Sequence, residues 1–332
     1  MLIRLLLYIT ICLSFQVEAA TLKIATIAPD GTAWMKAMRN GAKMVESKTQ
    51  GRVKLRFYPG GVMGNDKSIL RKIRIGQLHG GAITGGGLTS IYPDAQVYNL
   101  PFRFQSFDEV DYVRKHMDPL LIEGIRKKGF ISFGLSEGGF AYLMSKNSIT
   151  TLSELQQQKV WVPEGDDISL AALHALNISP IPLPLTDVLT GLQTELINTV
   201  TTPAIGAIAL QWHTQLKHLV DVPITYLYGT LIITERALKK LSQEDRRILK
   251  QVLQDTFTSI NVQNRKDNES ALQALNNQGM QFIQPDKAEI EPWIELVNQS
   301  VIKMVSEGRF SREIFNIFQK HLATYRSEQK YR

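Results

Sequence analysis

The chain has 332 residues, of which 44% are hydrophobic and 21% are charged, so it can bury a large core and has the length of about two domains. Its single cysteine, Cys12, excludes a disulfide-stapled scaffold and a cysteine-rich metal centre. The net charge of +7 permits an anionic partner. No long run of Lys or Arg concentrates that charge, so the composition does not favour nucleic-acid binding.

Residues 1–19 have the pattern of a secretory signal peptide: a basic start at Arg4, an apolar stretch, and a polar end with small residues near Ala19. The apolar stretch is shorter than the roughly 20 residues that a membrane-spanning helix needs. Cleavage after about Ala19 would also remove Cys12. We therefore expect a mature, cysteine-free chain that is exported to the periplasm and is soluble there.

The first part of the mature chain alternates between strand and helix patterns. Short apolar or alternating strands are predicted at 22–27, 53–57 and 80–84. The segments between them carry apolar residues at spacings of three and four, which is typical of helices packed on a sheet. This β-α-β-α-β order predicts an α/β fold.

The same alternation continues to the C-terminus. Helices are predicted at 106–127, 168–176, 187–196, 243–276, 291–307 and 311–326, and strands at 130–133, 142–145, 159–162, 181–183, 198–201, 222–228 and 231–234. The strand-rich stretch 222–234 is long enough to cross from one domain to the other.

Sequence motifs for catalysis or cofactor binding are missing. The glycines between Gly80 and Gly87 do not have the spacing of a phosphate-binding loop, and no Lys-Ser/Thr pair follows them. The six histidines are scattered, and no G-x-S-x-G nucleophile motif occurs. We therefore predict no cofactor, no metal site and no enzymatic activity.

The most unusual local sequence is 159–167, a strand end with one Trp and three acids before a helix. Asp166 or Asp167 can cap the helix, and Trp161 can pack in the core. In the functional interpretation, the carboxyl end of the strand lies at a cleft, where Trp161 stacks on a ligand near Glu164.

Four sequence blocks, 51–64, 99–104, 155–163 and 192–203, together resemble the solute-binding proteins of TRAP transporters, the DctP-like family. The resemblance implies two α/β lobes joined by crossing hinge strands, with a cleft that closes on a small solute. It also implies delivery of the solute to an ion-driven permease of two membrane subunits. Neither step requires catalysis.

Two positions depart from this family pattern. Members that transport carboxylates typically have arginines where this chain has Trp161 and Ala141. Those arginines bind the ligand carboxylate through two parallel hydrogen bonds. A simple dicarboxylate is therefore not expected, and an apolar or aromatic solute is predicted. A solute with a cationic group over Trp161 near Glu164 also fits. Two alternatives stay open: a carboxylate receptor that uses other cations, such as Lys146, or backbone donors, and a sensor that presents its ligand to a membrane signalling protein.

The predicted ligand-binding residues come from both halves of the chain. They are Trp34, Thr84, Phe140, Tyr142, Trp161, Glu164, Asp166, Thr201, Gln211 and Trp212. For Trp34 and Trp212 core packing is an equally open interpretation. Lobe I is predicted to comprise 20–141 with about 230–285, and lobe II 142–229 with about 286–332. The protein is expected to be a monomer.

Overall fold

The computed structural model describes residues 19–330, so the predicted signal peptide, apart from Ala19, and Cys12 lie outside the described residues. The main sheet contains β1 (Ala20–Thr26), β2 (Val53–Tyr58), β3 (Gly80–Thr84), β4 (Phe130–Ser145), β7 (Thr199–Thr202), β8 (His218–Thr234) and β9 (Gln281–Ile283). Strands β5 (Trp161–Pro163) and β6 (Ile181–Leu183) form a second, parallel pair. The predicted α/β class is confirmed.

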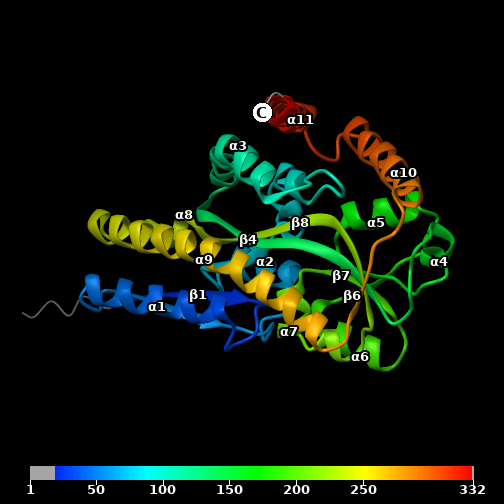
Figure 1. Ribbon diagram of the computed structural model, residues 1–332. Helices are drawn as coiled ribbons and strands as arrows, with labels where there is room; N and C mark the ends of the chain where they lie inside the picture. The colour runs from blue at the N-terminus through cyan, green and yellow to red at the C-terminus, as the bar shows by residue number, and fades with distance from the viewer. Residues whose placement is uncertain (1–18, 331–332) are drawn as a thin grey trace, which may run out of the picture.

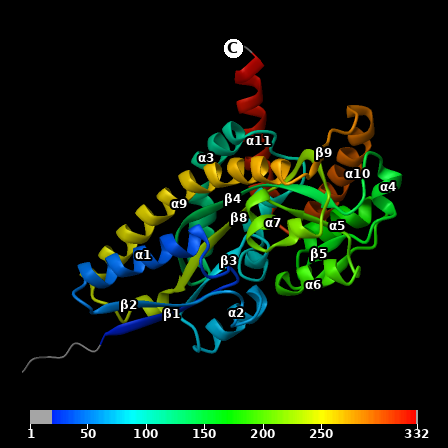
Figure 2. The same cartoon turned by 60° about the horizontal axis from the view of Figure 1, so that its bottom comes forward.

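Helices cover both faces of the sheet (Figures 1 and 2). They are α1 (Ala33–Lys48), α2 (Asp66–Arg74), α3 (Phe107–Lys127), α4 (Leu152–Gln156), α5 (Asp167–Ala175), α6 (Val188–Gln193), α7 (Ala204–Ala209), α8 (Glu235–Leu238), α9 (Gln243–Asn277), α10 (Lys287–Ser306) and α11 (Arg312–Lys330). Short 3-10 helices are η1 (Gly87–Ser90), η2 (Pro93–Asn99), η3 (Leu185–Asp187) and η4 (Trp212–Thr214). Within residues 19–330, no helix has the length and apolar character needed to cross a membrane.

Two long antiparallel strands, β4 and β8, connect the two lobes (Figure 1). The strand order is β2-β1-β3-β8-β4-β7, with β1 parallel to both of its neighbours and β9 paired with β8. Strand β8 pairs with β3 near Ile233 and with β9 near His218, so its two ends belong to different lobes. This is the two-lobed arrangement with crossing strands that the resemblance implied.

The crossing strands are longer than the sequence pattern predicted. Segments 130–133 and 142–145 were expected as separate strands but form one strand, β4, and 222–228 and 231–234 likewise form β8. Strand β4 passes through three register shifts in its pairing with β8, one of them between Glu137 and Gly139. Gly139 has a φ of +95°, which a residue with a side chain rarely adopts. Such bulges interrupt the alternation of side chains between the two faces of the sheet without ending the strand.

Two helices also pass from one lobe to the other. The predicted helix 243–276 is confirmed as α9, which buries Phe257 in the cluster with α1 and Leu275 in the cluster with α7 (Figure 2). Helix α10 buries Trp293 against α4 and α5, and Met304 in the cluster that includes α3 and α11. Because both helices contact both lobes, the residue ranges of the lobes stay a prediction.

Candidate functional site

Loops of the two lobes meet at an inter-lobe cleft, which lies between the start of α2 with the β3–η1 loop on one side and the β5–α5 turn on the other. Asn65 Nδ2 donates a hydrogen bond to Glu164 Oε2 at 2.9 Å, across 99 residues of sequence. A Cβ placed on Gly86 would lie 3.9 Å from Cγ of Asp166. The two lobes therefore touch here, through polar side chains on both sides.

Asp66 lies on the lobe I side of this cleft and is held by Thr84. Thr84 Oγ1 donates to Asp66 Oδ2 at 2.6 Å, its backbone N donates to the same oxygen at 3.2 Å, and Gly87 N donates to Thr84 Oγ1 at 3.0 Å. The other oxygen, Asp66 Oδ1, is buried without a hydrogen-bond partner in the part of the chain that the structure describes. Burial raises the pKa of Asp66 to about 6, and the two bonds from Thr84 lower it in part.

The cap of α2 is the residue before Asp66. Asn65 is the N-cap: its side chain accepts a hydrogen bond from Ser68 N at 3.0 Å. Asp66 is then the first residue of α2. Its carboxylate is not needed for the cap and turns to the β3–η1 loop instead. The sequence could not show the environment of the Asp66 carboxylate, because Thr84, which binds it, lies 18 residues further along the chain.

Asp166 and Glu164 lie on the lobe II side. Asp166 caps α5: Oδ1 accepts from Ser169 N at 3.0 Å, and Oδ2 accepts from Ser169 Oγ at 2.7 Å. The capping interpretation is therefore confirmed for Asp166, whereas Asp167 is the first residue of the helix. Burial raises the pKa of Asp166, and the bonds from Ser169 oppose that shift. Contact of a ligand with Asp166 or Glu164 stays a prediction.

Trp161 and Trp212 lie together in a hydrophobic cluster beneath β7 and α9. Their ring centroids are 5.2 Å apart and the rings meet edge to face. The Trp161 indole N–H donates to the carbonyl oxygen of Leu183 at 3.0 Å, and the two residues are 4% and 1% exposed. The structure thus gives both indoles a core-packing role, and a solute stacked on Trp161 stays a prediction.

The other predicted residues are distributed over several environments. Phe140 is buried between Phe107 and Tyr226, with ring centroids 4.9 and 5.8 Å away. Tyr142 is half-buried, and its burial raises the pKa of its hydroxyl. Thr201, which pairs with Leu143 across β7 and β4, is half-buried as well, and Gln211 is exposed before η4. Trp34 packs beside the α1–α9 cluster. The structure therefore brings only Thr84, Glu164 and Asp166 together at the cleft edge.

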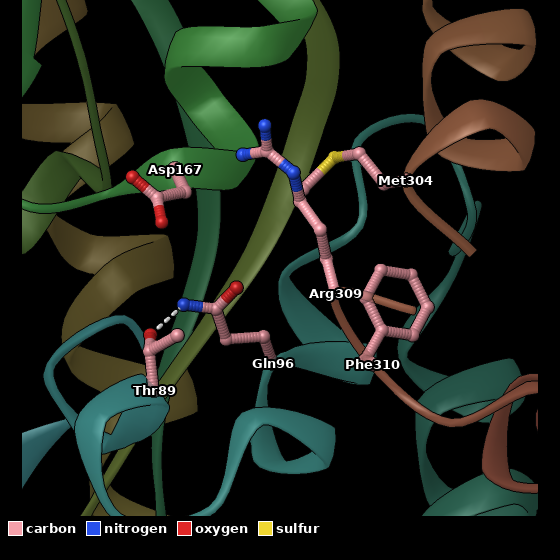
Figure 3. Close-up of a pocket in the computed structure, with 6 residues that line it drawn as sticks. All are labelled: Thr89, Gln96, Asp167, Met304, Arg309 and Phe310. Atoms are coloured by element: carbon pink, nitrogen blue, oxygen red, sulfur yellow. Dashed lines mark hydrogen bonds between the residues drawn. The ribbon is translucent and has the colours of Figure 1, made fainter. Parts of the chain in front are cut away.

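A cavity of about 260 Å³ adjoins the cleft, between η1 and η2, the first turn of α5, and the link from α10 to α11 (Figure 3). It is lined by Thr89, Gln96, Asp167, Met304, Arg309 and Phe310. None of these was predicted to bind a ligand, because the cavity joins four segments that are far apart in the sequence. Within residues 19–330 no group of three or more His, Cys, Asp or Glu side chains is placed to hold a metal ion.

Comparison with known proteins identifies the class of this chain. The family model of bacterial extracellular solute-binding proteins, family 7, matches residues 24–307, and the chain belongs to this family. It is thus a solute-binding protein and not an enzyme.

Individual relatives are distant but cover most of the chain. The sialic acid-binding periplasmic protein SiaP of Vibrio cholerae is 23% identical, over 86% of this chain and 89% of its own. The C4-dicarboxylate-binding periplasmic protein DctP of Rhodobacter capsulatus is 20% identical over 84% and 85%. The sugar acid binding protein of Advenella mimigardefordensis, solved with galactonate, has a TM-score of 0.85 at 19% identity, with 92% of this chain and 98% of that chain covered. The two curated relatives are periplasmic solute-binding proteins by name, and the solved structure has the same fold as this chain.

Proposed function

We propose that this chain is an extracytoplasmic receptor that captures a small organic solute between its lobes and delivers it to a TRAP-type permease. Family membership and the two-lobed fold support this role. The proposed solute is apolar or aromatic over most of its surface and is not a simple dicarboxylate. The receptor is proposed to act as a monomer in the periplasm.

One observation carries the proposal about the solute: the charged groups beside the contact between Asn65 and Glu164 are acidic. Asp66, Glu164 and Asp166 lie there, while the two positions at which carboxylate-binding relatives were expected to carry arginine hold Trp161 and Ala141, both buried. A dicarboxylate would be repelled by these acids and would lack the charge-assisted bonds of a guanidinium. A group that donates hydrogen bonds, such as a hydroxyl or an amine, matches the free oxygen of Asp66.

Thermal shift with a ligand panel tests this proposal. Succinate, galactonate and glucuronate are compared with neutral and amine-bearing aromatic solutes, on the wild-type protein and on Trp161→Phe. Phe retains most of the buried volume, whereas Trp161→Ala would cost about 3–5 kcal/mol of stability by opening a cavity. Trp293→Phe, a buried Trp of α10, is the matched control.

We expect an aromatic solute to raise the Tm of the wild type and of Trp293→Phe, and to raise that of Trp161→Phe by less. Stabilisation by succinate or galactonate that is equal in all three proteins would contradict both the predicted solute and the role of Trp161. Delivery is measured as uptake of the stabilising solute by cells, which should be lost when the gene for this chain is deleted and restored when it is returned.

A further inference from the structure

The cavity beside the cleft is lined by two exposed side chains of opposite charge, Asp167 and Arg309, which do not pair with each other; Arg309 pairs with Glu307 instead. Arg309 Nε donates to Glu307 Oε2 at 3.2 Å, but its two terminal nitrogens make no hydrogen bond or ion pair with any residue between 19 and 330. The carboxylate of Asp167 has no such partner in the same range either. Figure 3 shows both side chains around the same space, Asp167 from α5 and Arg309 from the link between α10 and α11.

The floor of the cavity is buried and combines an apolar wall with a buried amide. Met304 and Phe310 are each 4% exposed and form one wall. Gln96 is 3% exposed, and its Nε2 donates to Thr89 Oγ1 and to the carbonyl oxygen of Gly86. The amide is thereby oriented, so that its Oε1 oxygen is available as an acceptor. A ligand in this space would meet a cation, an anion, an acceptor and an apolar wall.

We infer that this cavity is a binding site for a small zwitterion of the amino-acid type with an apolar side chain. The ligand carboxylate would bind the terminal nitrogens of Arg309. Its ammonium group would bind Asp167 and Gln96 Oε1, and its side chain would pack on Met304 and Phe310. At about 260 Å³, the cavity lies below the roughly 300–1,000 Å³ of sites for drug-sized ligands and has room for a compact solute.

The arrangement of charges favours a zwitterion over a singly charged ligand. A simple carboxylate bound to Arg309 would lie near the negative charge of Asp167, and a simple amine bound to Asp167 would lie near Arg309. Only a ligand with both charges satisfies both residues at once. Asp167 lies next to the cap of α5 on one side of the cleft, and Thr89 and Gln96 lie in η1 and η2 on the other, so a bound zwitterion would also stabilise the closed arrangement of the lobes. This inference goes beyond the solute proposed for the cleft at Asp66 and Glu164.

Isothermal titration of the full mature chain with L-leucine and L-phenylalanine tests the site. Two leucine analogues each lack one charge: 4-methylpentanoate lacks the ammonium, and 3-methylbutan-1-amine lacks the carboxylate. The variants are Arg309→Gln and Asp167→Asn, with Arg312→Gln and Glu269→Gln, both exposed and outside the cavity, as matched controls. Circular dichroism and Tm of each variant establish that it is folded.

We expect each cavity variant to lose at least tenfold in affinity for leucine, with the controls unchanged. Asp167→Asn should gain affinity for 4-methylpentanoate, and Arg309→Gln should gain affinity for the amine, because each substitution removes the repelling charge. A purely structural role for either residue would not produce this exchange of preference.

The inference is wrong if millimolar leucine and phenylalanine do not bind the wild type, or if they bind the cavity variants as tightly as the wild type. Either result leaves the proposed receptor function intact, provided that another solute still stabilises the protein in a manner that depends on Trp161. Failure of every solute to stabilise the wild type would instead count against the receptor function itself.

Discussion

Individual carboxyl groups at the cleft show how burial sets the properties of this site. Asp166 uses both oxygens to cap α5, so its burial is compensated by hydrogen bonds. Asp66 has bonds to only one oxygen, and the other is buried without a partner. An unpartnered buried carboxylate is costly unless a ligand or a proton satisfies it. We therefore regard Asp66 as a group whose ionisation opposes folding in the empty protein.

The pKa of Asp66 predicts the pH dependence of its contribution. Because its pKa is raised from 3.8 to about 6, the folded protein binds a proton more tightly than the unfolded chain. Below about pH 4 Asp66 is protonated in both states and does not lower the free energy of unfolding. As the pH rises to about 6 its ionisation lowers that free energy progressively, and above pH 6 this penalty is constant. Asp66→Asn should remove it and stabilise the empty protein by about 1–3 kcal/mol at pH 7.5, with little change at pH 4.

Urea unfolding of wild type and Asp66→Asn at the two pH values measures this difference. Glu269→Gln, an exposed carboxylate on α9, serves as the control and should show no pH-dependent gain. An equal effect of Asp66→Asn at pH 4 and pH 7.5 would show that ionisation of Asp66 does not oppose folding.

At the scale of elements, helix α9 supports the crossing strand β4 where its pairing with β8 is interrupted. Asn261 accepts from Glu137 N at 2.7 Å and donates to the carbonyl oxygen of Leu135 at 3.0 Å. Asn264 and Asn268 donate to the carbonyl oxygens of Glu137 and Gly138. The polar residues of α9 thus satisfy backbone groups that the register shift leaves unpaired.

The same region buries an ion pair between β4 and α9. Glu137 is 1% exposed and accepts from Arg265 Nε and Nη2, both at 2.9 Å, and from the Tyr226 hydroxyl at 3.0 Å. Arg265→Met should destabilise the protein by about 3–5 kcal/mol, because it leaves a buried carboxylate without its main partner. Glu137→Gln combined with Arg265→Met should recover part of that loss.

A double-mutant cycle in denaturant measures the coupling between the two residues. Strictly additive effects of the two single substitutions would show that the pair contributes no interaction energy. Lys266→Met, at the position after Arg265 on α9, controls for removal of a long cationic side chain from this helix.

For the whole molecule, the contact between Asn65 and Glu164 links the lobes in the closed arrangement. Asn65→Asp retains a residue that caps helices well, but it places a second carboxylate against Glu164. Repulsion should disfavour closure, weaken solute affinity by up to about tenfold, and diminish with added salt. Asn65→Ser retains the cap without the charge and should leave the salt dependence unchanged.

Small-angle scattering with and without solute measures closure as a decrease in radius of gyration. We expect Asn65→Asp to remain more open than wild type at low ionic strength and to approach it at high ionic strength. A radius of gyration for Asn65→Asp equal to that of wild type at every salt concentration would show that this contact does not influence closure.

Sequence patterns predicted the fold correctly where the periodicity of a helix or strand was clear within its own segment. Alternation of strands and helices predicted the α/β class, and the helix predicted at 243–276 matches α9 almost to its ends. The first block of the family resemblance proves to connect lobe I to this helix: Arg52 pairs with buried Asp245, at 2.9 Å. Site residues were harder to predict, because burial and partners depend on segments that are distant in the sequence. Trp161 is an example: its packing against Trp212 is set by distant segments, and its stacking on a ligand stays a prediction.

The sequence by itself determined the class of this protein, because periodicity and punctuation are local and the family blocks follow one another in order. It also determined that Trp161 and Ala141 occupy the positions where arginine was expected. Only the tertiary structure decided which polar groups face one another: Asn65 with Glu164, and Asp167 with Arg309 around one cavity. Those pairs join residues up to 142 positions apart, and no local pattern specifies which distant loops meet when two lobes close.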